Sequence, residues 1–508
     1  MWRWKLLMSR VFRWGAAVLA VAAVLVTSGA AVPSPVTGMD RFYRQQPKWK
    51  PCAVETLDAA GGSCAAVRVP LDYADPDGRT LNIAISRVPA TDPDRRRGVL
   101  LADPGGPGAS GLDTVDLLGD VLAPEVRAQY DLIGMDPRGV GRSDGGRTCG
   151  WPIGEMIRSA GVGRDGFLTD TARAARLAMA CLTGDSAALR QLTTRNTARD
   201  MEVIRRVLGE PSLSYYGVSY GTYLGAVFAQ LFPRSVDRMV LDSAIDPDRY
   251  WNGMVHDWGA ADEAALDDWA GWAARRDPDY HFGTTAAQVR GAVEQLMNDI
   301  ARQPITVNDF VIDDHWLPFL LHNLLGNFRL NEKMADTVAE LRAATGATPP
   351  AGHTPWLTDT LDSLRQYEDS ALAFVACGDD AAPEDPVRYW SEIEQRRATQ
   401  PIFGALAANI QPCAFWPRPV ESITAVRNSV SALIVQATGD PRTPYDHALA
   451  LHRDLSASRL VTLADVRIHM TFRPGLSRCV GAAINGYFAD GVFPATDVVC
   501  APDTEAEP

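Results

Sequence analysis

Apolar runs of strand length alternate with helical stretches in two separate parts of the chain. In residues 40–246, short apolar runs such as residues 99–102 are followed by segments with helical spacing, and the last run is RMVLDSAID at 238–246. The same alternation resumes in residues 425–500. Alternating strands and helices predict a mostly parallel sheet with helices on both faces. The pattern therefore indicates one α/β core, built from both parts of the chain.

Residues 247–424 interrupt this core and have a different pattern. The segment is rich in Trp, Asp and Ala, and stretches such as DEAALDDWAGWAARR at 262–276 show helical periodicity. Prolines at 349, 350 and 355 mark an exposed loop inside it. We therefore predict that the core carries an inserted helical cap. The polar tail, residues 501–508, is expected to be disordered.

Residues 217–221 read GVSYG, a G-x-S-x-G pentapeptide that follows a short apolar run and opens a helix-like stretch. Such a sharp strand-to-helix turn holds a nucleophile in a strained conformation, and only small residues two before and two after it avoid a clash. Ser219 is therefore a candidate nucleophile. The alternative is an ordinary serine in a glycine-rich loop.

A serine hydroxyl needs a base and an acid that orients the base, and in hydrolases with this turn both follow the serine along the chain. An apolar run at residues 432–435 precedes the turn that holds Asp440, the candidate acid. His469 follows the strand-like run RLVTLADV and is the candidate base. His447 and His452 lie in a stretch with helical spacing. Of these two, His447 is the alternative base.

The glycine-rich run PGGPG at residues 104–108 follows the strand-like run at 99–102. Glycines let backbone N–H groups approach a substrate closely, so we assign an oxyanion hole to the amides of Gly106 and Tyr220. A phosphate-binding loop is the alternative. It is disfavoured because no Lys-Ser/Thr follows these glycines and the G-x-G-x-x-G spacing is absent.

Five segments occur in an order that is more specific than any one of them: PGGPG, GMDPRGVGRSD, GVSYGTYLG, TGDPRTP and SRCVGAAINGYFADGVFPATDVVC. Over residues 49–500 the chain resembles the secreted tripeptidyl aminopeptidase family of α/β-hydrolases, relatives of proline iminopeptidase with a TAP-like C-terminal region. The resemblance implies an α/β-hydrolase fold. It also implies a serine exopeptidase that forms an acyl-enzyme and releases short peptides, typically tripeptides, from free N-termini.

Carried over residue by residue, the family's triad falls on Ser219, Asp440 and His469, the same residues that chain order selects. The chain departs from the family pattern at one place, because the family's histidine is usually followed by glycine and here Met470-Thr471 follows it. A free N-terminus also needs a carboxylate at a fixed distance from the serine. The leading candidates for that substrate-amine site are Asp379, Asp380 and Asp242.

Residues 1–30 have the composition of a signal peptide. They contain four basic and no acidic residues, an apolar run at 15–26, and small residues after it. The run is short for a membrane span of about 20 residues, so we expect export and cleavage, with an uncleaved anchor as the alternative. The enzyme is thus expected to be extracellular, with association with the cell envelope as the alternative.

The chain has an even number of cysteines, which in an exported protein predicts disulfides. Connectivity does not follow from the sequence, and the resemblance implies pairing in sequence order, most clearly between Cys479 and Cys500. A zinc site is disfavoured because no pair has C-x-x-C spacing, so we expect no metal. The cysteines are Cys52, Cys64, Cys149, Cys181, Cys377, Cys413, Cys479 and Cys500.

The formal net charge is −13, so the protein is not expected to bind nucleic acid. We expect a monomer without cofactors that acts on peptide or protein N-termini. Three classes of function remain open: an exopeptidase, an esterase with the same triad acting on small esters or amides, and a catalytically dead binding protein. The third would require the loss of a triad residue, and all three are present.

Overall fold

The computed structural model describes residues 38–503, except 147, 308–309, 346–353 and 365–367. The predicted signal peptide, most of the predicted loop after residue 344 and the last five residues of the tail lie outside the described residues. No described helix is both long enough and apolar enough to cross a bilayer.

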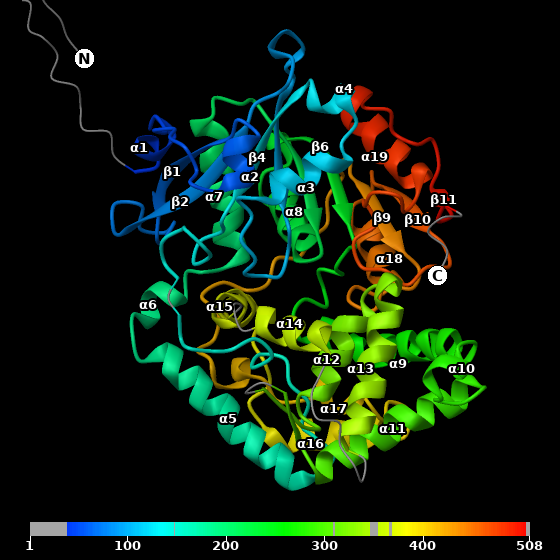
Figure 1. Cartoon of the computed structure of the whole chain (residues 1–508). Helices are drawn as coiled ribbons and strands as arrows, with labels where there is room; N and C mark the ends of the chain where they lie inside the picture. Colours follow the sequence, from blue (N-terminus) through cyan, green and yellow to red (C-terminus); the bar gives the residue numbers. More distant parts are fainter. Residues whose placement is uncertain (1–37, 147, 308–309, 346–353, 365–367, 504–508) are drawn as a thin grey trace, which may run out of the picture. The chain divides into compact units, whose positions relative to one another are not determined.

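A nine-stranded sheet forms the core, in the order β1-β2-β4-β3-β5-β6-β9-β10-β11 (Figure 1). The first two strands run antiparallel to their neighbours, and all later pairs are parallel. The predicted mostly parallel sheet is thus confirmed. The strands are β1 (Ser63–Pro70), β2 (Thr80–Val88), β3 (Gly98–Asp103), β4 (Tyr130–Met135), β5 (Leu213–Val218), β6 (Val236–Asp242), β9 (Leu433–Ala437), β10 (Arg459–Leu463) and β11 (Val498–Cys500).

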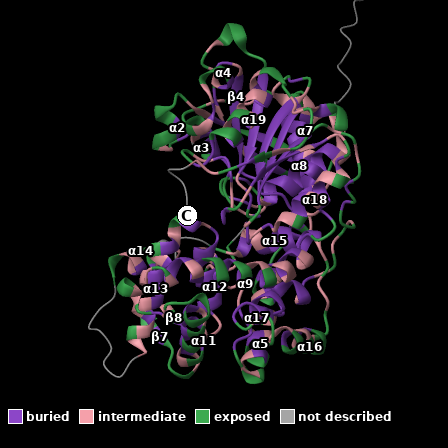
Figure 2. Cartoon of the chain, turned by 90° about the vertical axis from the view of Figure 1, so that its right-hand side faces the viewer, coloured by how far each residue is buried: buried purple, intermediate pink, exposed green. Residues whose placement is uncertain are grey.

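Helices cover both faces of this sheet, as the alternating pattern predicted. Along β3, Val99 and Leu101 belong to one hydrophobic cluster and Leu100 and Ala102 to another, because successive side chains of a strand point to opposite faces. The first cluster contains residues of α7 (Thr194–Val207), α8 (Tyr220–Leu231) and α18 (Tyr445–Asp454); the second contains residues of α3 (Thr114–Val121), α4 (Pro124–Arg127) and α19 (Arg478–Asp490). The central strands are therefore buried on both sides (Figure 2).

The chain between β6 and β9 is mostly helical. It contains one small two-stranded sheet of β7 (Ile305–Val307) and β8 (Phe310–Ile312). Its helices are α9 (Asn252–Ala274), α10 (Asp277–Tyr280), α11 (Ala286–Arg302), α12 (Leu317–Leu325), α13 (Asn331–Ala344), α14 (Pro355–Leu364), α15 (Ser370–Asp379), α16 (Pro386–Arg396) and α17 (Gly404–Ala407). The boundaries of the cap as a separate domain stay a prediction.

A helix from the first part of the core also packs on this inserted segment. In α5 (Arg164–Leu182), the Phe167 ring lies 5.5 Å from the Trp390 ring, and Asp170 accepts a hydrogen bond from Asn409. The helical layer is thus built from more than the insertion. The remaining helices are α1 (Asp40–Tyr43), α2 (Glu55–Ala59) and α6 (Ser186–Leu189), with short 3₁₀ turns at Pro93–Arg95, Pro233–Ser235, Phe328–Leu330 and Pro412–Phe415.

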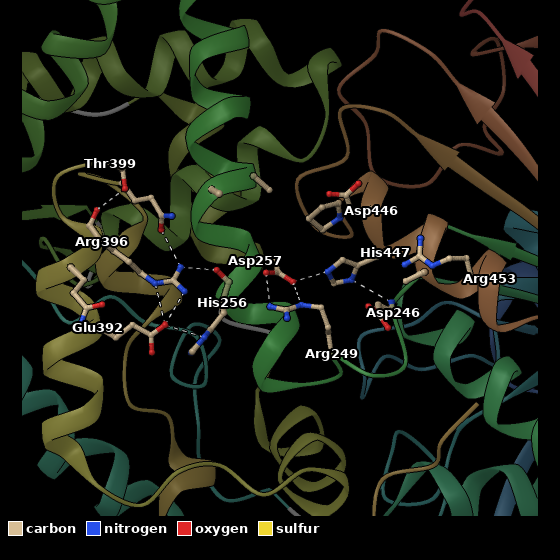
Figure 3. Close-up of a pocket in the computed structure, with 16 residues that line it drawn as sticks. Asp246, Arg249, His256, Asp257, Glu392, Arg396, Thr399, Asp446, His447 and Arg453 are labelled. Carbon is tan, nitrogen blue, oxygen red and sulfur yellow. Dashed lines mark hydrogen bonds and ion pairs between the residues drawn. The ribbon is translucent and has the colours of Figure 1, made fainter. Parts of the chain in front are cut away.

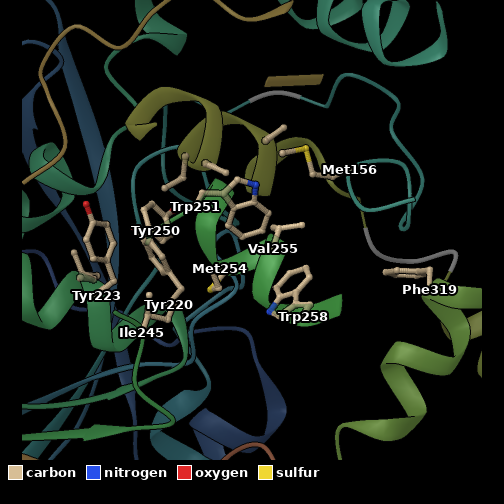
Figure 4. Packing of buried hydrophobic residues seen from close by; sticks show 14 of the residues in the cluster. Met156, Tyr220, Tyr223, Ile245, Tyr250, Trp251, Met254, Val255, Trp258 and Phe319 are labelled. Atoms are coloured by element: carbon tan, nitrogen blue, oxygen red, sulfur yellow. The ribbon is translucent and has the colours of Figure 1, made fainter. Parts of the chain in front are cut away.

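Aromatic side chains join the first helix after the predicted nucleophile to the first helix of the insertion (Figure 4). Tyr223 of α8 stacks on Tyr250 with ring centroids 4.1 Å apart, and Tyr220 lies 5.9 Å from the same ring. Trp251 continues the cluster to Trp258 of α9 at 5.9 Å. Buried aromatic pairs contribute about 0.5–1.5 kcal/mol beyond their area, so this cluster fixes the insertion against the core.

The eight cysteines form four disulfides in sequence order, as the resemblance implied. Two of them close segments of the core, one links the region before α5 to α5 itself, and one lies in the inserted segment. The pairs are Cys52–Cys64, Cys149–Cys181, Cys377–Cys413 and Cys479–Cys500.

Candidate active site

The GVSYG segment forms a sharp turn between β5 and α8. Ser219 has φ 56° and ψ −121°, in the region that residues with a side chain rarely adopt. A Cβ at Gly217 would lie 2.4 Å from the Gly221 carbonyl oxygen, and a Cβ at Gly221 would lie 2.8 Å from Asp103 Oδ1. Both flanking positions therefore require glycine, as the elbow prediction assumed. The strained serine stands at the carboxyl end of a central strand, with the N-terminus of α8 behind it.

Asp440 and His469 come together at the ends of neighbouring strands. His469 Nδ1 lies 2.8 Å from Asp440 Oδ2, and the buried carboxylate also accepts from Arg442 N at 2.8 Å and from Thr443 Oγ1 at 2.9 Å. Burial alone would raise the pKa of Asp440, but the adjacent His469 and these donors hold it below its ordinary value. Asp440 is thus an anion that orients the imidazole. The other ring nitrogen, Nε2, has no hydrogen bond to the described chain.

The His469 loop is held by its backbone. His469 N donates to the Gly326 carbonyl at 2.8 Å, and Met470 N donates to Ser243 Oγ at 2.9 Å. Met470 has φ 72°, in the left-handed region that glycine adopts most readily. This explains why glycine is usual at the position. Here the hydrogen bond from Met470 to Ser243 keeps a side-chain residue in that conformation.

Asp242 connects this loop to the predicted nucleophile. Ser219 N donates to the Asp242 carbonyl at 3.0 Å, while the Asp242 carboxylate accepts from Thr471 N at 3.0 Å and Phe472 N at 2.9 Å. Tyr216 OH also donates to the carboxylate, at 2.9 Å, and the residue has no exposed surface. These contacts disfavour Asp242 as the predicted substrate-amine site, because its oxygens are occupied by donors that hold the histidine loop.

Asp379 is likewise engaged with the protein. One of its oxygens accepts from Thr194 N at 2.8 Å and the other from Thr194 Oγ1 at 2.5 Å, and Thr194 Oγ1 lies 2.6 Å from Tyr220 OH. Burial raises the pKa of Asp379 to about 7, against the lowering effect of these donors. Asp379 therefore caps α7 and supports the residue after Ser219. It is a poor candidate for the substrate-amine site.

Asp380 is bound mainly through one of its oxygens. Its Oδ2 accepts from Asn252 Nδ2 at 2.6 Å and from Trp251 N at 3.2 Å, and the Ala381 backbone N–H also bonds the carboxylate. The residue is half-buried, and burial raises its pKa. Of the three predicted carboxylates, Asp380 alone is partly exposed.

The PGGPG loop lies against the elbow. A Cβ at Gly105 would come within 3.0 Å of Ser219 Cβ and 3.2 Å of Tyr220 N, so this loop and the turn are in direct contact. Gly105 N is taken by Asp103 Oδ1 at 2.9 Å, which leaves the amide of the exposed Gly106 as the next donor. Tyr220 is the first residue of α8, so its N–H has no acceptor within the helix. This arrangement is compatible with the predicted oxyanion hole.

His447, the alternative base, lies elsewhere (Figure 3). Its Nδ1 accepts from Asp246 N at 3.3 Å and its Nε2 lies 2.9 Å from Asp257 Oδ2, so both ring nitrogens are occupied. Asp257 is also held by Arg249 at 2.7 Å. The pair lines a cavity of about 970 Å³ whose walls include residues of α9, α16 and α18.

Among the described residues, one group of three acids could share a cation: Asp246, Asp248 and Asp454. Arg427 already pairs with Asp248 at 2.7 Å and with Asp454 at 2.8 Å. The guanidinium thus supplies the positive charge that these carboxylates need.

The sequence analysis missed Asp103 and Asp136, which hold the two ends of the PGGPG loop. Asp136 Oδ1 accepts from Ser110 Oγ at 2.6 Å and from Gly111 N at 3.0 Å. Asp103 ends β3 and Asp136 follows β4 directly, and an acid at the end of a buried strand is the signal that could have found them.

The comparisons with known proteins agree with this geometry. Residues 98–296 match the family model described as the alpha/beta hydrolase fold, and residues 400–500 match the model of TAP-like proteins. The fold and these family matches define a serine hydrolase of the α/β-hydrolase class, and the elbow and the Asp440–His469 pair are compatible with it.

Named relatives identify a family within that class. The chain is 33% identical to a tripeptidyl aminopeptidase of Streptomyces coelicolor, over 91% of this chain and 87% of the relative. It is 29% identical to a protein named carboxylesterase B of Mycobacterium tuberculosis, over 94% and 92%, and 28% identical to serine protease Hip1 of Mycobacterium bovis, over 96% of both. The chain belongs to the tripeptidyl aminopeptidase family of α/β-hydrolases.

Proposed function

We propose that the protein is a secreted serine exopeptidase that releases tripeptides from free N-termini. The observation that carries the proposal is the Asp440–His469 hydrogen bond, in a loop tied through Asp242 to the backbone of Ser219. The similarity to a tripeptidyl aminopeptidase over nine-tenths of the chain supports the exopeptidase class.

In this proposal, Ser219 Oγ attacks the scissile carbonyl while His469 Nε2 accepts its proton. Asp440 stabilises the imidazolium and fixes its tautomer. The amides of Gly106 and Tyr220 stabilise the oxyanion. His469 then protonates the leaving amine, which is the new N-terminus of the shortened substrate. Water, activated by the same histidine, hydrolyses the acyl-enzyme and releases the short peptide.

We further propose that Asp380 binds the substrate's α-ammonium. Helix α15 contacts the PGGPG loop near its start, because a Cβ at Gly108 would lie 2.7 Å from Leu372 N. Asp380 follows the end of that helix, about 12 Å along its axis from Leu372. An extended tripeptide spans about 10 Å. The two lengths are similar, so a carboxylate at this position can bind the α-ammonium of a tripeptide and thereby set the length of the product.

The test is a panel of matched substrates: tripeptidyl-p-nitroanilides with free and acetylated N-termini, aminoacyl-p-nitroanilides, and p-nitrophenyl esters. A charge-assisted pair worth about 2–4 kcal/mol makes the free tripeptide better in kcat/KM by roughly 30- to 1000-fold. Asp380→Asn should reduce that preference. Glu384→Gln, a change at an exposed carboxylate nearby, is the matched control. Equal cleavage of free and acetylated peptides by the wild type contradicts the exopeptidase proposal.

An esterase is the second candidate. The same triad hydrolyses esters, and one relative carries the name carboxylesterase B. The esterase prediction is that p-nitrophenyl esters are turned over faster than any free tripeptidyl anilide, with no effect of N-terminal acetylation or of Asp380→Asn.

Secretion is proposed from the composition of residues 1–30, and the four disulfides are compatible with it. Mass spectrometry of the exported protein should show a start near residue 31 and no free thiols. An intact N-terminus would favour the retained anchor instead.

A further inference from the structure

Asp103 lies next to both segments that carry the predicted oxyanion donors. It is the last residue of β3 and almost fully buried, and its Oδ1 accepts from Gly105 N at 2.9 Å. The same oxygen lies 2.8 Å from where a Cβ of Gly221 would be. One carboxyl group is therefore packed between the PGGPG loop and the elbow turn.

The acids at the two ends of the PGGPG loop differ in their partners. Asp136 accepts from Ser110 Oγ, Gly111 N and Arg142 N, so its charge is shared among three donors. Asp103 has a single donor, Gly105 N, and forms no ion pair with any described residue. A buried carboxylate normally needs a cation or several donors.

The titratable groups around Asp103 give it no positive charge. Burial keeps the pKa of Tyr215 of β5 and of Tyr220 of α8 well above the ordinary value, and a negative charge on Asp103 would raise both further. Tyr215 OH donates to the Gly221 carbonyl and Tyr220 OH bonds Thr194 Oγ1, so neither hydroxyl donates a hydrogen bond to Asp103. Burial raises the pKa of Asp103 to about 7, although the Gly105 donor lowers it.

We propose that Asp103 positions the two oxyanion donors, and that it does so as an uncharged carboxyl while the enzyme is active. This inference rests on the proposed function, because it assigns the oxyanion hole to the loop next to Asp103. An uncharged acid keeps the Gly105 hydrogen bond and adds no negative charge. An ionised Asp103 would place a buried negative charge beside the loop and the turn that stabilise the oxyanion, and would repel it.

The expected consequence is a loss of turnover on the alkaline side. As Asp103 ionises above about pH 7, kcat should fall by on the order of tenfold, with KM little changed, because the oxyanion forms only in the transition state. The rise of kcat on the acid side, where the general base loses its proton, is separate from this effect.

The experiment compares kcat and KM from pH 5 to 9.5 for four full-length proteins: wild type, Asp103→Asn, Asp103→Leu and Asp94→Asn, a control that removes an exposed charge near β3. Asp103→Asn keeps the acceptor without ionising, so it should keep kcat within about threefold of the wild type at pH 6 and lose the alkaline fall. Asp103→Leu removes the acceptor and should lower kcat by roughly 10²-fold at every pH. The control should keep the alkaline fall.

An alkaline fall of the same size in Asp103→Asn overturns the claim of an uncharged carboxyl, and wild-type kcat in Asp103→Leu overturns the positioning role. Thermal unfolding checks that each variant is folded; if Asp103→Leu is not, the pH profile of Asp103→Asn decides. Ser219→Ala is measured in parallel. Activity retained in Ser219→Ala means that the proposed function fails, whereas an inactive Ser219→Ala with unaffected Asp103 variants means that only this inference fails.

Discussion

Of the histidine–aspartate pairs in the described chain, His469–Asp440 and His447–Asp257 were the two candidates for the base, and only the first is tied to the elbow. His469 and Asp440 lie 2.8 Å apart at the carboxyl ends of core strands, whereas His447 and Asp257 lie 2.9 Å apart where α18 meets α9. The first histidine has one ring nitrogen without a partner in the described chain, and the second has none. A carboxylate partner is therefore not enough to identify the base. The free nitrogen and the backbone link to Ser219 together favour His469 over His447 for the proposed role.

The most direct test of the assignment of the base is to replace each histidine in turn. Because a triad acts as a unit, His469→Ala should cut kcat by on the order of 10⁴- to 10⁶-fold, and His447→Ala should change it by less than about threefold. Steady-state kinetics on a free tripeptidyl-p-nitroanilide measure both. Near-normal activity in His469→Ala together with loss in His447→Ala would reverse the assignment.

The two aspartates give the next largest contrast. Asp440→Asn keeps the shape of the side chain but favours the wrong imidazole tautomer, so kcat should fall by about 10⁴-fold. Asp257→Asn should leave kcat within about threefold. Labelling of Ser219 by a fluorophosphonate provides a second measurement, and it should slow in the first variant only. Equal labelling rates in both variants would remove Asp440 from the triad.

For folding stability, in contrast to kcat, we expect the larger loss when His447 is removed. His447 joins α18 of the core to α9 of the insertion, so His447→Ala leaves Asp257 and the Asp246 amide each without one partner. We expect a loss of about 1–2 kcal/mol in the free energy of unfolding, read from urea titration at pH 7. His452→Ala, on the same helix, serves as the control. A loss no larger than in the control would mean that the pair does not hold the two parts together.

The smallest expected effect is on the stability of the protein at acid pH. Burial alone would raise the pKa of Asp257, but His447 and Arg249 hold it below its ordinary value. The native carboxylate therefore stays charged at a pH where the unfolded chain has begun to bind a proton. This stabilisation is complete above about pH 4 and is lost as the pH falls through the native pKa. Between pH 5 and 3, the unfolding temperature of Asp257→Asn should fall less than that of the wild type. An equal fall in both proteins would contradict this account.

The sequence was sufficient for features that depend on local order along the chain. The strand before Ser219, the glycines around it and the turn after residues 432–435 are short-range patterns, and they selected Ser219, Asp440 and His469 without knowledge of contacts. The parallel sheet followed from alternation in the same way. The roles of these three residues remain a proposal, although the structure places Asp440 and His469 in hydrogen-bond contact.

The sequence was insufficient where a role depends on what lies across the fold. Asp242 and Asp379 look like free acids in the sequence, yet their partners, Thr471 and Thr194, lie far away along the chain. The packing of α5 on the inserted helices is also a long-range contact that helical periodicity cannot reveal. Counting acids near a site therefore overestimates how many can bind substrate.

The position of the insertion affects the order in which the site is made. Strands β6 and β9 are neighbours, with Val240 opposite Leu433, although the whole of residues 243–432 lies between them. A ribosome that adds about 5–20 residues per second needs roughly 10 to 45 seconds to travel from Ser219 to Asp440. Throughout that interval the nascent chain carries the proposed nucleophile Ser219 without Asp440 or His469. If these residues act as proposed, hydrolysis begins only after the last part of the chain has been synthesised.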